Sequence, residues 1–361
     1  MTARSLLIVN YRSAALTANA VRSAREASSL TLQVVIVDNS CDPAEAGALR
    51  GVGDELVVAE RNLGYAGGIN RGRKSCAGEV IVVSNPDVIF TPGCIDLLAD
   101  ALTSRVAVAG PALFWDDRAV WHLPPSDLFT GRQKLDEILA SRSRGWAARR
   151  DRRRFRERVS FWALRDPTPV RSLSGAVMAI RTSELDEAGG FDERFPLYFE
   201  ETDFLRRMTG RGREILYVPA AQCRHLFNQS AGQNSAAAAE RFADSELRYL
   251  EKWNGPFLAR AAKALERPAA GPAGSGEAPW SPGPTSGQAP AARPSVGVNR
   301  EGIVVEASPL ASFATAAGCF AEPGVVSLPQ DVWESWRGGM LYMRSVVAAT
   351  GEVLAVVRAV K

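Results

Sequence analysis

Leu6-Leu-Ile-Val9, followed at once by the polar Asn10-Tyr11-Arg12, is the stretch that decides the fold. A short continuous apolar run is typical of a strand that is buried on both faces. The next residues, 14–26, are predicted to form a helix that starts near Ser13. Three later runs repeat this pattern and end at polar residues: 33–37 before Asp38, 55–58 before Asn62, and 79–83 before Asp87. Strands that alternate with helices predict an α/β fold with a mostly parallel sheet covered on both faces.

The rest of the chain divides by composition. Residues 175–180 and 215–218 are predicted strands, the second ending at Pro219, and 236–265 are rich in helix formers. Residues 267–300 are rich in Pro, Gly, Ala and Ser and are predicted to be a flexible linker. Residues 301–361 are β-rich, with a hairpin turn expected at 349–352. We therefore expect an α/β domain over 1–266 and a small β-rich domain of unknown role over 301–361.

Composition excludes several classes of function. The formal net charge of +3 is too small to indicate a nucleic-acid partner. The five cysteines are scattered without a CxxC pair, which argues against a zinc or redox motif. No run approaches the about 20 apolar residues of a membrane span, and the N-terminus lacks the features of a signal peptide. The predicted location is the cytoplasm.

The residues that follow the four strands indicate a binding site. Ligands of open parallel sheets bind beyond the carboxyl ends of the strands. Asn10, Asp38, Asn62 and Asp87 occupy these ends, and all four offer side-chain oxygens. An Asn or Asp at one such position usually caps the following helix. Four together predict a shared polar crevice.

Two acidic motifs could carry chemistry. Asp87, in Asn85-Pro-Asp87, could bind Mg²⁺ or Mn²⁺ between two phosphates, although this tripeptide is also common in turns. Glu200, Glu201 and Asp203 lie at the predicted start of a helix, where acidic residues are favourable in any case. Their crowding also predicts either a cationic partner or a carboxyl with the raised pKa of a general base. His225 follows a later strand and is a candidate ligand for metal or phosphate.

The segment from Asn62 to Gly72, Asn-Leu-Gly-Tyr-Ala-Gly-Gly-Ile-Asn-Arg-Gly, is glycine-rich and is expected to precede a helix. Glycines permit close backbone approach to a phosphate. The segment does not match the GxGxxG fingerprint, which argues against a nicotinamide dehydrogenase.

In this order the motifs resemble the inverting glycosyltransferases of family 2, especially their bacterial rhamnosyltransferase-like branch. The resemblance covers about residues 4–260. It rests on eight stretches: Ile8-Val-Asn-Tyr11, Val37-Asp-Asn-Ser40, Arg61 to Asn70, Ser84-Asn-Pro-Asp-Val88, Leu173-Ser-Gly-Ala-Val177, Gly189 to Phe195, Tyr198 to Phe204, and His225 to Ser230.

The resemblance implies a GT-A fold, a nucleoside diphosphate sugar as donor (a dTDP- or UDP-sugar) and a single displacement. It places Asp87 and His225 at a divalent metal, Mg²⁺ or Mn²⁺, and Gly175 and Ala176 on the acceptor side. Glu201 stands where the family usually has an Asp as catalytic base, with Glu200 and Asp203 as the other candidates. The donor side comprises Asn10, Tyr11, Asp38, Asn39, Asn62, Gly64, Asn70 and Asn85, with Asp38 as the residue that would read the pyrimidine base.

An arginine cluster between Arg142 and Arg158 has two interpretations. It is either a solvated helix face, with Trp146 and Phe155 packed beneath it, or a contact with an anionic membrane surface or a lipid-linked acceptor. Enzymes similar to this one often act on lipid-linked glycans. Two other functions stay open at this point: a nucleotidyltransferase, and a non-catalytic protein that binds sugar nucleotides or glycans.

Overall fold

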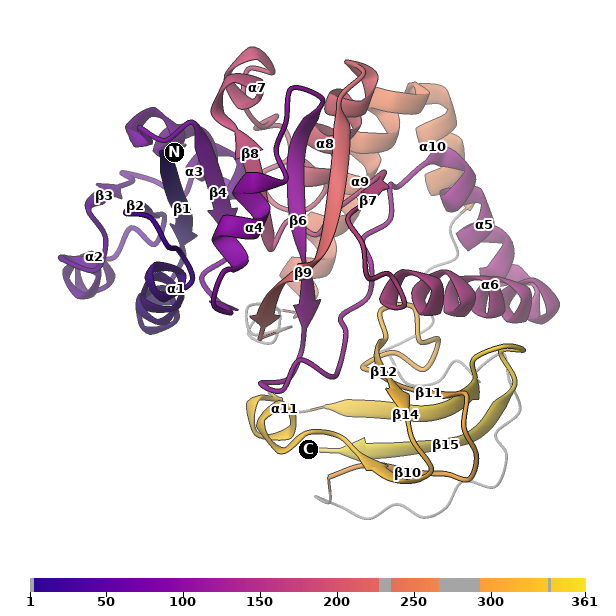
Figure 1. Ribbon diagram of the computed structural model, residues 1–361. Coiled ribbons are helices and arrows are strands. Elements are labelled where there is room, and N and C mark those ends of the chain that lie inside the picture. Colours follow the sequence, from indigo (N-terminus) through magenta and orange to yellow (C-terminus); the bar gives the residue numbers. More distant parts are fainter. Residues whose placement is uncertain (1–2, 227–234, 266–292, 337–338) are drawn as a thin grey trace.

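The computed structural model describes residues 3–226, 235–265, 293–336 and 339–361. A large α/β unit contains residues up to 265, and two small antiparallel sheets form a second unit from residue 293 onward (Figure 1). The predicted fold class, an α/β fold with a mostly parallel sheet covered on both faces and a small β-rich C-terminal region, is confirmed.

The large sheet has nine strands in the order β3-β2-β1-β4-β8-β6-β9-β5, with β7 beside β9. Strands β1 to β4 are mutually parallel, whereas β8 runs antiparallel to both β4 and β6. The strands are β1 (Arg4–Asn10), β2 (Leu32–Asp38), β3 (Glu55–Val58), β4 (Val80–Ser84), β5 (Val88–Phe90), β6 (Val106–Phe114), β7 (Thr168–Val170), β8 (Val177–Arg181) and β9 (Glu214–His225). The sheet is therefore parallel in its first half and mixed in its second.

The first strand is buried on both faces, as its unbroken apolar sequence predicts. Leu6 and Ile8 belong to the core on one side of the sheet, and Leu7 and Val9 belong to the core on the other. Side chains of a strand alternate between the two faces, so each core receives every second residue. This arrangement fixes the ends of the strands, where Asn10 of β1 pairs with Asp38 of β2.

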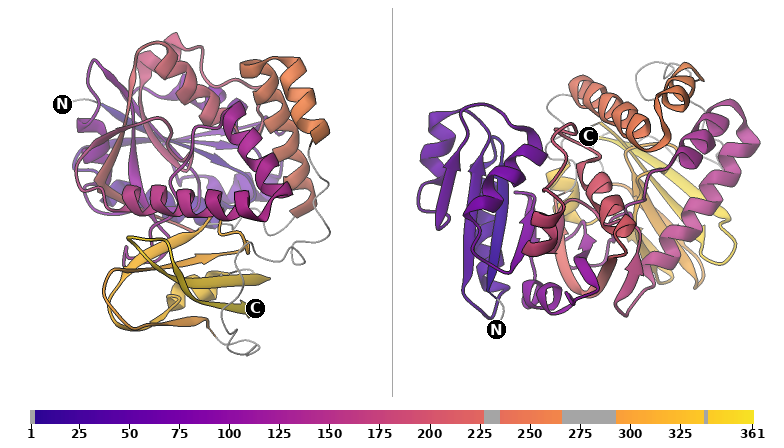
Figure 2. Two further views of the ribbon diagram at one scale, coloured as in Figure 1. Left: turned by 90° about the vertical axis from the view of Figure 1, so that its right-hand side faces the viewer. Right: turned by 90° about the horizontal axis from the view of Figure 1, so that it is seen from above.

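The helices of the large unit lie on both sides of this sheet (Figure 2). They are α1 (Ala14–Glu26), α2 (Pro43–Leu49), α3 (Gly64–Gly72), the 3₁₀ turn η1 (Arg73–Ser75), α4 (Cys94–Asp100), α5 (Gly131–Arg142), α6 (Arg144–Trp162), α7 (Thr182–Glu187), α8 (Glu200–Gly210), α9 (Ser235–Asn254) and α10 (Pro256–Leu265). The predicted helices at 14–26 and 236–265 are confirmed, the second as the pair α9 and α10.

The glycine-rich segment differs from its prediction, because its glycines form helix α3 instead of a loop before a helix. A Cβ atom on Gly68 would lie 2.7 Å from Val9 Cγ1, and one on Gly72 would lie 2.3 Å from Leu7 Cδ1. These glycines therefore allow α3 to pack closely on β1. The sequence predicted a close approach of this backbone to a phosphate, whereas Gly68 and Gly72 bring the backbone of α3 close to strand β1.

Strand β9 also differs from its prediction, since it continues past Pro219 to His225. Its pairing with β6 shifts between Val218 and Gln222, so the proline lies in an irregularity of the ladder. Proline has no N–H for a ladder and is tolerated at such a bulge. The continuation carries His225 to the carboxyl ends of the first strands.

The C-terminal unit consists of a two-stranded and a four-stranded antiparallel sheet, the latter in the order β12-β11-β14-β15. Its first strand lies inside the segment 267–300 that was predicted to be a linker; residues 267–292 of that segment are outside the described residues. The predicted hairpin turn is confirmed, because Gly351 N–H donates to Val347 O and has a φ of 77°. The elements are β10 (Ser295–Val298), β11 (Ile303–Ser308), β12 (Ala317–Ala321), β13 (Gly324–Ser327), α11 (Gln330–Ser335), β14 (Met340–Val347) and β15 (Val353–Val360).

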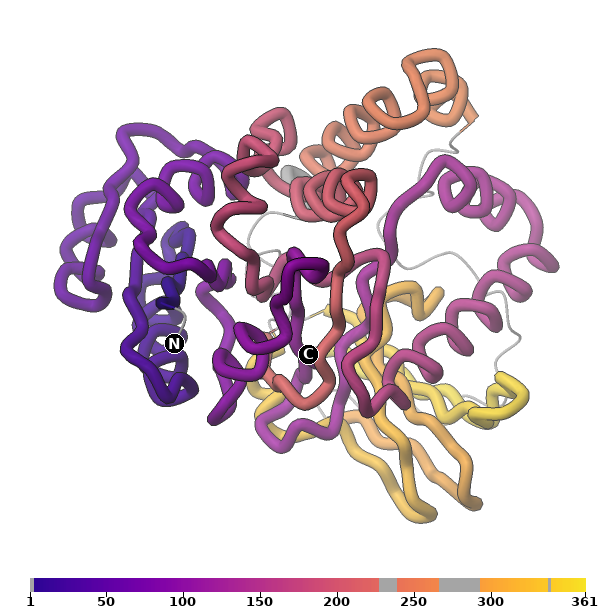
Figure 3. The backbone as a smooth tube through the Cα atoms, turned by 45° about the horizontal axis from the view of Figure 1, so that its top comes forward, coloured from indigo at the N-terminus to yellow at the C-terminus, as the bar shows by residue number. Residues whose placement is uncertain are grey.

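The two units share one core. Trp115, Trp121 and Leu123, from the loop after β6, are buried among the apolar side chains of the C-terminal sheets. His122 and Gly318 exchange backbone hydrogen bonds of 2.8 and 2.9 Å, which joins this loop to β12. The C-terminal strands, yellow in Figure 3, lie beside helix α6 and away from the indigo N-terminal strands.

Helix α6, which carries most of the arginine cluster, is partly an interface element. Phe155 is buried against the C-terminal unit, whereas Trp146 is 38% exposed and donates to Asp136. Arg158 pairs with buried Glu306 of β11 at 2.6 Å. The prediction that the cluster is one solvated face over two packed aromatic residues is therefore wrong for Arg158 and Trp146.

Candidate active site

Asp38 lies at the end of β2 with one of its two carboxylate oxygens free. Its Oδ1 accepts hydrogen bonds from Asn10 Nδ2 at 3.0 Å and from Ser40 N–H at 3.1 Å. The Oδ2 atom is buried and has no hydrogen-bond partner among the described residues. Leaving a buried carboxylate oxygen unpaired is costly, so this atom is suited to accept an N–H from a ligand.

Asn10 holds Asp38 in place. Its Oδ1 accepts from Ser13 Oγ and Thr17 Oγ1, both at 2.9 Å, and its Nδ2 also donates to Glu45 Oε2 at 3.0 Å. All the hydrogen-bonding capacity of the buried Asn10 amide is thus used inside the protein. Tyr11, the residue directly after β1, is 51% exposed. Contact of Asn10 and Tyr11 with a donor stays a prediction, and the structure gives Asn10 a positioning role.

The start of helix α3 is held by two asparagines. Asn39 donates to Gly64 O at 2.7 Å and accepts from Leu63 N–H, and Asn62 accepts from Gly64 N–H at 2.8 Å. Gly64 has a φ of 72°, and a Cβ atom there would lie 2.5 Å from Pro196 O. These contacts fix the helix N-terminus on the loop before α8.

Asn70, at the other end of α3, forms a clip with the loop before α8. Its Nδ2 donates to Phe191 O at 2.8 Å, and its Oδ1 accepts from Phe191 N–H at 2.8 Å. Glu193 accepts a further hydrogen bond from the same amide. The structure therefore assigns Asn70 to packing, and its predicted contact with the donor remains without support from these contacts.

Asp87 and His225 come together although they are far apart in sequence. Asp87 Oδ1 lies 3.2 Å from His225 Nε2, and both side chains are largely buried. Two backbone contacts set this distance: Val88 of β5 pairs with His225 of β9, and Leu226 N–H donates to Asp87 O. Beside them, Asn85 N–H donates to Ala176 O at 2.8 Å, which places the predicted acceptor-side residue next to the metal motif.

This pair fits a divalent cation. Its 3.2 Å separation is close to the about 3 Å between adjacent ligands of an octahedral ion with bonds of about 2.1 Å. Within the described ranges, no group of three or more His, Cys, Asp and Glu side chains could hold a metal ion. A carboxylate and an imidazole alone suit an ion that keeps water and phosphate oxygens as its other ligands.

Glu200, which is buried, and Glu201, which is half-buried, lie side by side at the start of α8. Burial and the charge of Glu201 raise the pKa of Glu200 well above its usual value, and burial raises the pKa of Glu201. The Oε2 atom of Glu200 has no hydrogen-bond partner among the described residues. Tyr198 and Phe199, just before them, both have left-handed backbones, with φ values of 68° and 67°. Such strain is typical of residues that present a functional group.

Tyr65 lies close to both Glu200–Glu201 and Asp87, and its role was missed by the sequence analysis. Its hydroxyl donates to Gly175 O at 3.2 Å. Burial and the charges of Glu200, Glu201 and Asp87 raise the pKa of this hydroxyl well above its usual value. Gly175 also borders Glu201, because a Cβ atom on Gly175 would lie 3.2 Å from Glu201 Cγ. The carboxylates of α8 and the Asp87–His225 pair therefore face one site.

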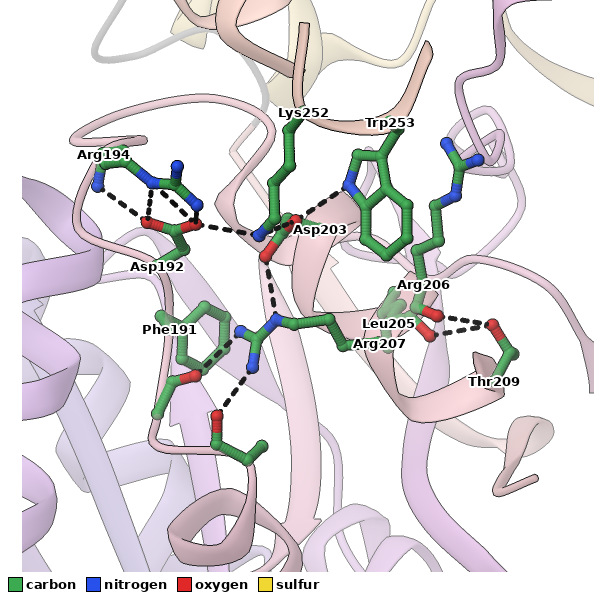
Figure 4. A network of polar contacts seen from close by, with 12 residues as sticks. Phe191, Asp192, Arg194, Asp203, Leu205, Arg206, Arg207, Thr209, Lys252 and Trp253 are labelled. Atoms are coloured by element: carbon green, nitrogen blue, oxygen red, sulfur yellow. Dashed lines mark hydrogen bonds and ion pairs between the residues drawn. The ribbon is translucent and has the colours of Figure 1, made fainter. Parts of the chain in front are cut away.

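Asp203 does not belong to this site, which counts against its candidacy as the general base. Figure 4 shows its carboxylate between three donors. Trp253 Nε1 donates to it at 2.9 Å, Arg207 Nε donates at 2.9 Å, and Lys252 Nζ pairs with it at 2.6 Å. This fully buried carboxylate uses both of its oxygens to anchor α8 to α9, so neither oxygen is turned toward the site.

Comparison with known proteins agrees with this geometry. The sequence profile of the family described as "Glycosyltransferase like family 2" matches residues 3–245. The chain is 30% identical over 226 residues to proteins named N-acetylglucosaminyl-diphospho-decaprenol L-rhamnosyltransferase from two strains of Mycobacterium tuberculosis; the match covers 57% of this chain and 70% of each relative.

A solved structure is also similar, that of the mannosyltransferase PcManGT from Pyrobaculum calidifontis in complex with GDP-Man and Mn²⁺. It shares 15% identity at a TM-score of 0.47, over 73% of this chain and 74% of that one.

Across the described part of the chain, no helix has both the length and the apolar character that a bilayer crossing requires. The family match covers the four strand ends, the Asp87 motif, His225 and the carboxylates of α8. The chain belongs to glycosyltransferase family 2 and is an enzyme that moves a sugar from a nucleotide sugar.

Proposed function

We propose that the protein is an inverting, metal-dependent glycosyltransferase that moves a sugar, most simply rhamnose, from a nucleoside diphosphate sugar to an acceptor hydroxyl in the synthesis of a cell-surface glycan. One observation carries the proposal: the Tyr65 hydroxyl, bonded to Gly175, is close enough to Glu200, Glu201 and Asp87 for the charge of each to raise its pKa, and Asp87 pairs with His225. A candidate cation-binding pair and a carboxyl with a raised pKa, both close to Tyr65, suit the departure of a diphosphate and the attack of a hydroxyl.

The donor would be a dTDP- or UDP-sugar. The free Oδ2 of Asp38 would accept the ring N–H of a pyrimidine base, with Asn10 holding the carboxylate in place. Two relatives that are 30% identical to the chain are named L-rhamnosyltransferases, which supports rhamnose. Their names also specify a lipid diphosphate that carries N-acetylglucosamine, so we include a lipid-linked glycan among the acceptors.

Asp87 and His225 would hold Mg²⁺ or Mn²⁺. Such an ion, when bound, neutralises negative charge on the leaving diphosphate. Their mutual distance is already suitable for this role, so little reorganisation is needed when the donor binds.

Glu201 would act as the general base. Its carboxylate takes the proton of the acceptor hydroxyl while the acceptor oxygen forms a bond to the anomeric carbon and the bond from that carbon to the diphosphate breaks. The nucleoside diphosphate leaves with the bonding electrons. Attack opposite to the leaving group inverts the anomeric configuration.

A binding screen tests the donor site. UDP, dTDP and GDP are titrated into the wild type and Asp87→Ala, each with and without Mn²⁺ or Mg²⁺. We expect metal-dependent binding of a pyrimidine nucleotide that weakens at least about tenfold in Asp87→Ala. Asp166→Ala, at an exposed aspartate between α6 and β7, serves as the matched control. Absence of nucleotide binding by the wild type would overturn the proposed function, and equal binding by Asp87→Ala would overturn the role of that residue.

The acceptor side could lie at a membrane surface. Arg149, Arg152 and Arg156 lie on one exposed side of α6 and line a hollow of about 730 Å³ that also includes Phe161 and Leu164. Arg149 and Arg152 form no ion pair with the described residues. Three exposed arginines on one side of a helix suit an anionic lipid surface, at about 1 kcal/mol each, and would hold the enzyme peripherally at the inner face of the membrane. We expect vesicles with anionic lipid to retain the wild type at low salt and to release a variant with these three arginines changed to glutamine. Equal retention of both would contradict this proposal.

A further inference from the structure

The C-terminal unit reaches the end of the strand that carries His225. Asp331, in the first turn of α11, pairs with Arg224 of β9 at 3.0 Å. The same carboxylate oxygen accepts a hydrogen bond from Asp117 N–H at 2.9 Å. Arg224 also pairs with the side chain of Asp117 and donates to Trp115 O at 3.3 Å. A single residue of the C-terminal unit thus holds both the end of β9 and the loop after β6.

Arg224 and His225 are neighbours in an extended strand, so their side chains point to opposite faces. The side chain of His225 meets Asp87 on one face, and the side chain of Arg224 meets Asp331 and Asp117 on the other. The orientation of the imidazole therefore depends on how firmly Arg224 is held.

The ion pair between Arg224 and Asp331 lies in a packed part of the interface. The Arg224 side chain is 17% exposed and that of Asp331 27% exposed. Trp336, just after α11, packs edge-on against Trp115 with ring centroids 6.0 Å apart. The ion pair is thus partly shielded from water and sits beside a packed aromatic pair, where it stabilises more than an exposed pair does.

We propose that Asp331 is a positioning residue for the catalytic site: through Arg224 it fixes the end of β9 and holds His225 against Asp87. This inference rests on the proposed metal role of His225. It gives the C-terminal unit, whose sequence shows no chemistry of its own, a function in the transferase reaction. The relevant analogy is with residues outside the ligand shell that orient a metal-binding histidine.

Two measurements on Asp331→Ala and Asp331→Asn test the proposal. The first is the Kd of Mn²⁺ in the presence of the nucleoside diphosphate that binds best, which we expect to rise about tenfold in Asp331→Ala. The second is amide hydrogen exchange of residues 220–226, which we expect to accelerate in both variants while exchange in α6 and β11 is unchanged. Asp331→Glu, which keeps the charge, should restore most of the Mn²⁺ affinity.

The matched control is Glu352→Gln, which removes an exposed ion pair of the same unit with Arg300 and should change neither quantity. Unchanged Mn²⁺ affinity in both Asp331 variants would overturn the proposal, even if exchange were faster, because Asp331 would then be only structural. If the wild type bound no Mn²⁺ with any nucleotide, the proposed function would fail, and unchanged exchange at 220–226 would separately overturn the positioning role.

Discussion

At the scale of single residues, the site combines two carboxyls with raised pKa values and one carboxylate with a free oxygen. Glu200 is buried and Glu201 is half-buried beside it, and the raised pKa of each carboxyl disfavours two negative charges side by side. Glu201 is the one that borders Gly175, on the side where we place the acceptor. This contact is the reason for choosing Glu201 over Glu200 as the base.

Replacing Glu201 tests that choice. We expect Glu201→Gln to lower kcat about 10²- to 10⁴-fold, because general-base catalysis typically contributes that factor, and to leave nucleotide affinity unchanged. Glu201→Asp keeps a carboxylate and should retain far more activity. Sugar-transfer assays at saturating donor measure both. A Gln variant with more than about a tenth of wild-type kcat would show that another group takes the proton.

The pKa of Glu201 also predicts a pH dependence. The base works in its ionised form, so the rate rises with pH as this carboxyl loses its proton. Since burial raises its pKa, the acidic limb of the rate profile should lie above the about 4.3 of an ordinary glutamate. A profile of kcat against pH for the wild type checks this, and a midpoint at or below the ordinary value would contradict it.

Sequence reasoning at this scale succeeded where chemistry is visible in the residue type. It identified Asp87 and His225, and the structure places them 3.2 Å apart. It missed Tyr65, because a tyrosine within a glycine-rich segment carries no signal that its hydroxyl reaches Gly175. It also grouped Asp203 with Glu200 and Glu201, because sequence proximity does not reveal that Lys252 and Arg207 neutralise this carboxylate.

At the scale of elements, helix α3 connects the donor side to the loop before α8. The backbone of Gly64 passes so close to Pro196 that Tyr65 N–H donates to Pro196 O at 2.6 Å. This contact places Tyr65 at the centre of the site. The sequence predicted that the backbone at these glycines approaches another group closely. It could not identify Pro196, over a hundred residues later, as the neighbour of Gly64, because that contact depends on the tertiary fold.

Gly64→Ala should therefore disturb the site through the backbone. The left-handed φ alone costs about 1 kcal/mol, and the clash with Pro196 adds to it. Gly93→Ala is a matched control, because Gly93 has a φ of 78° and no atom of the described residues would lie within 4 Å of an added Cβ. We expect a larger loss of unfolding free energy for Gly64→Ala than for Gly93→Ala, and a loss of transfer activity for Gly64→Ala alone. Equal losses of stability would show that the loop can move away from the new methyl group.

At the scale of the whole molecule, a buried ionic cluster joins the two units. Glu306 of β11 is fully buried between Arg158 of α6 and Arg344 of β14. Arg344 also pairs with Asp151 of α6 at 2.8 Å. The sequence predicted the two units by composition, but it could not predict this docking, since an arginine in a basic run gives no sign of a partner about 150 residues away.

Glu306→Gln tests the strength of this docking. It leaves two buried guanidinium groups without their shared carboxylate, so we expect a loss of about 3–5 kcal/mol of unfolding free energy. The exposed pair of Glu352 with Arg300 should contribute no more than about 1 kcal/mol, so Glu352→Gln serves as the comparison. Denaturant unfolding followed by tryptophan fluorescence measures both. Similar small losses in the two variants would indicate that water enters the interface freely.

The core that the two units share around Trp115 and Trp121 limits how the chain can be shortened or recombined. A chain shortened to residues 3–245, the part that matches the family, would expose these tryptophans and Leu123 to water. They would form a hydrophobic surface patch that favours aggregation. The loop after β6, helix α6 and the C-terminal sheets therefore depend on one another for burial of their apolar side chains. A transplant of the catalytic half onto another scaffold needs all three, or a redesigned loop in which polar side chains replace the tryptophans.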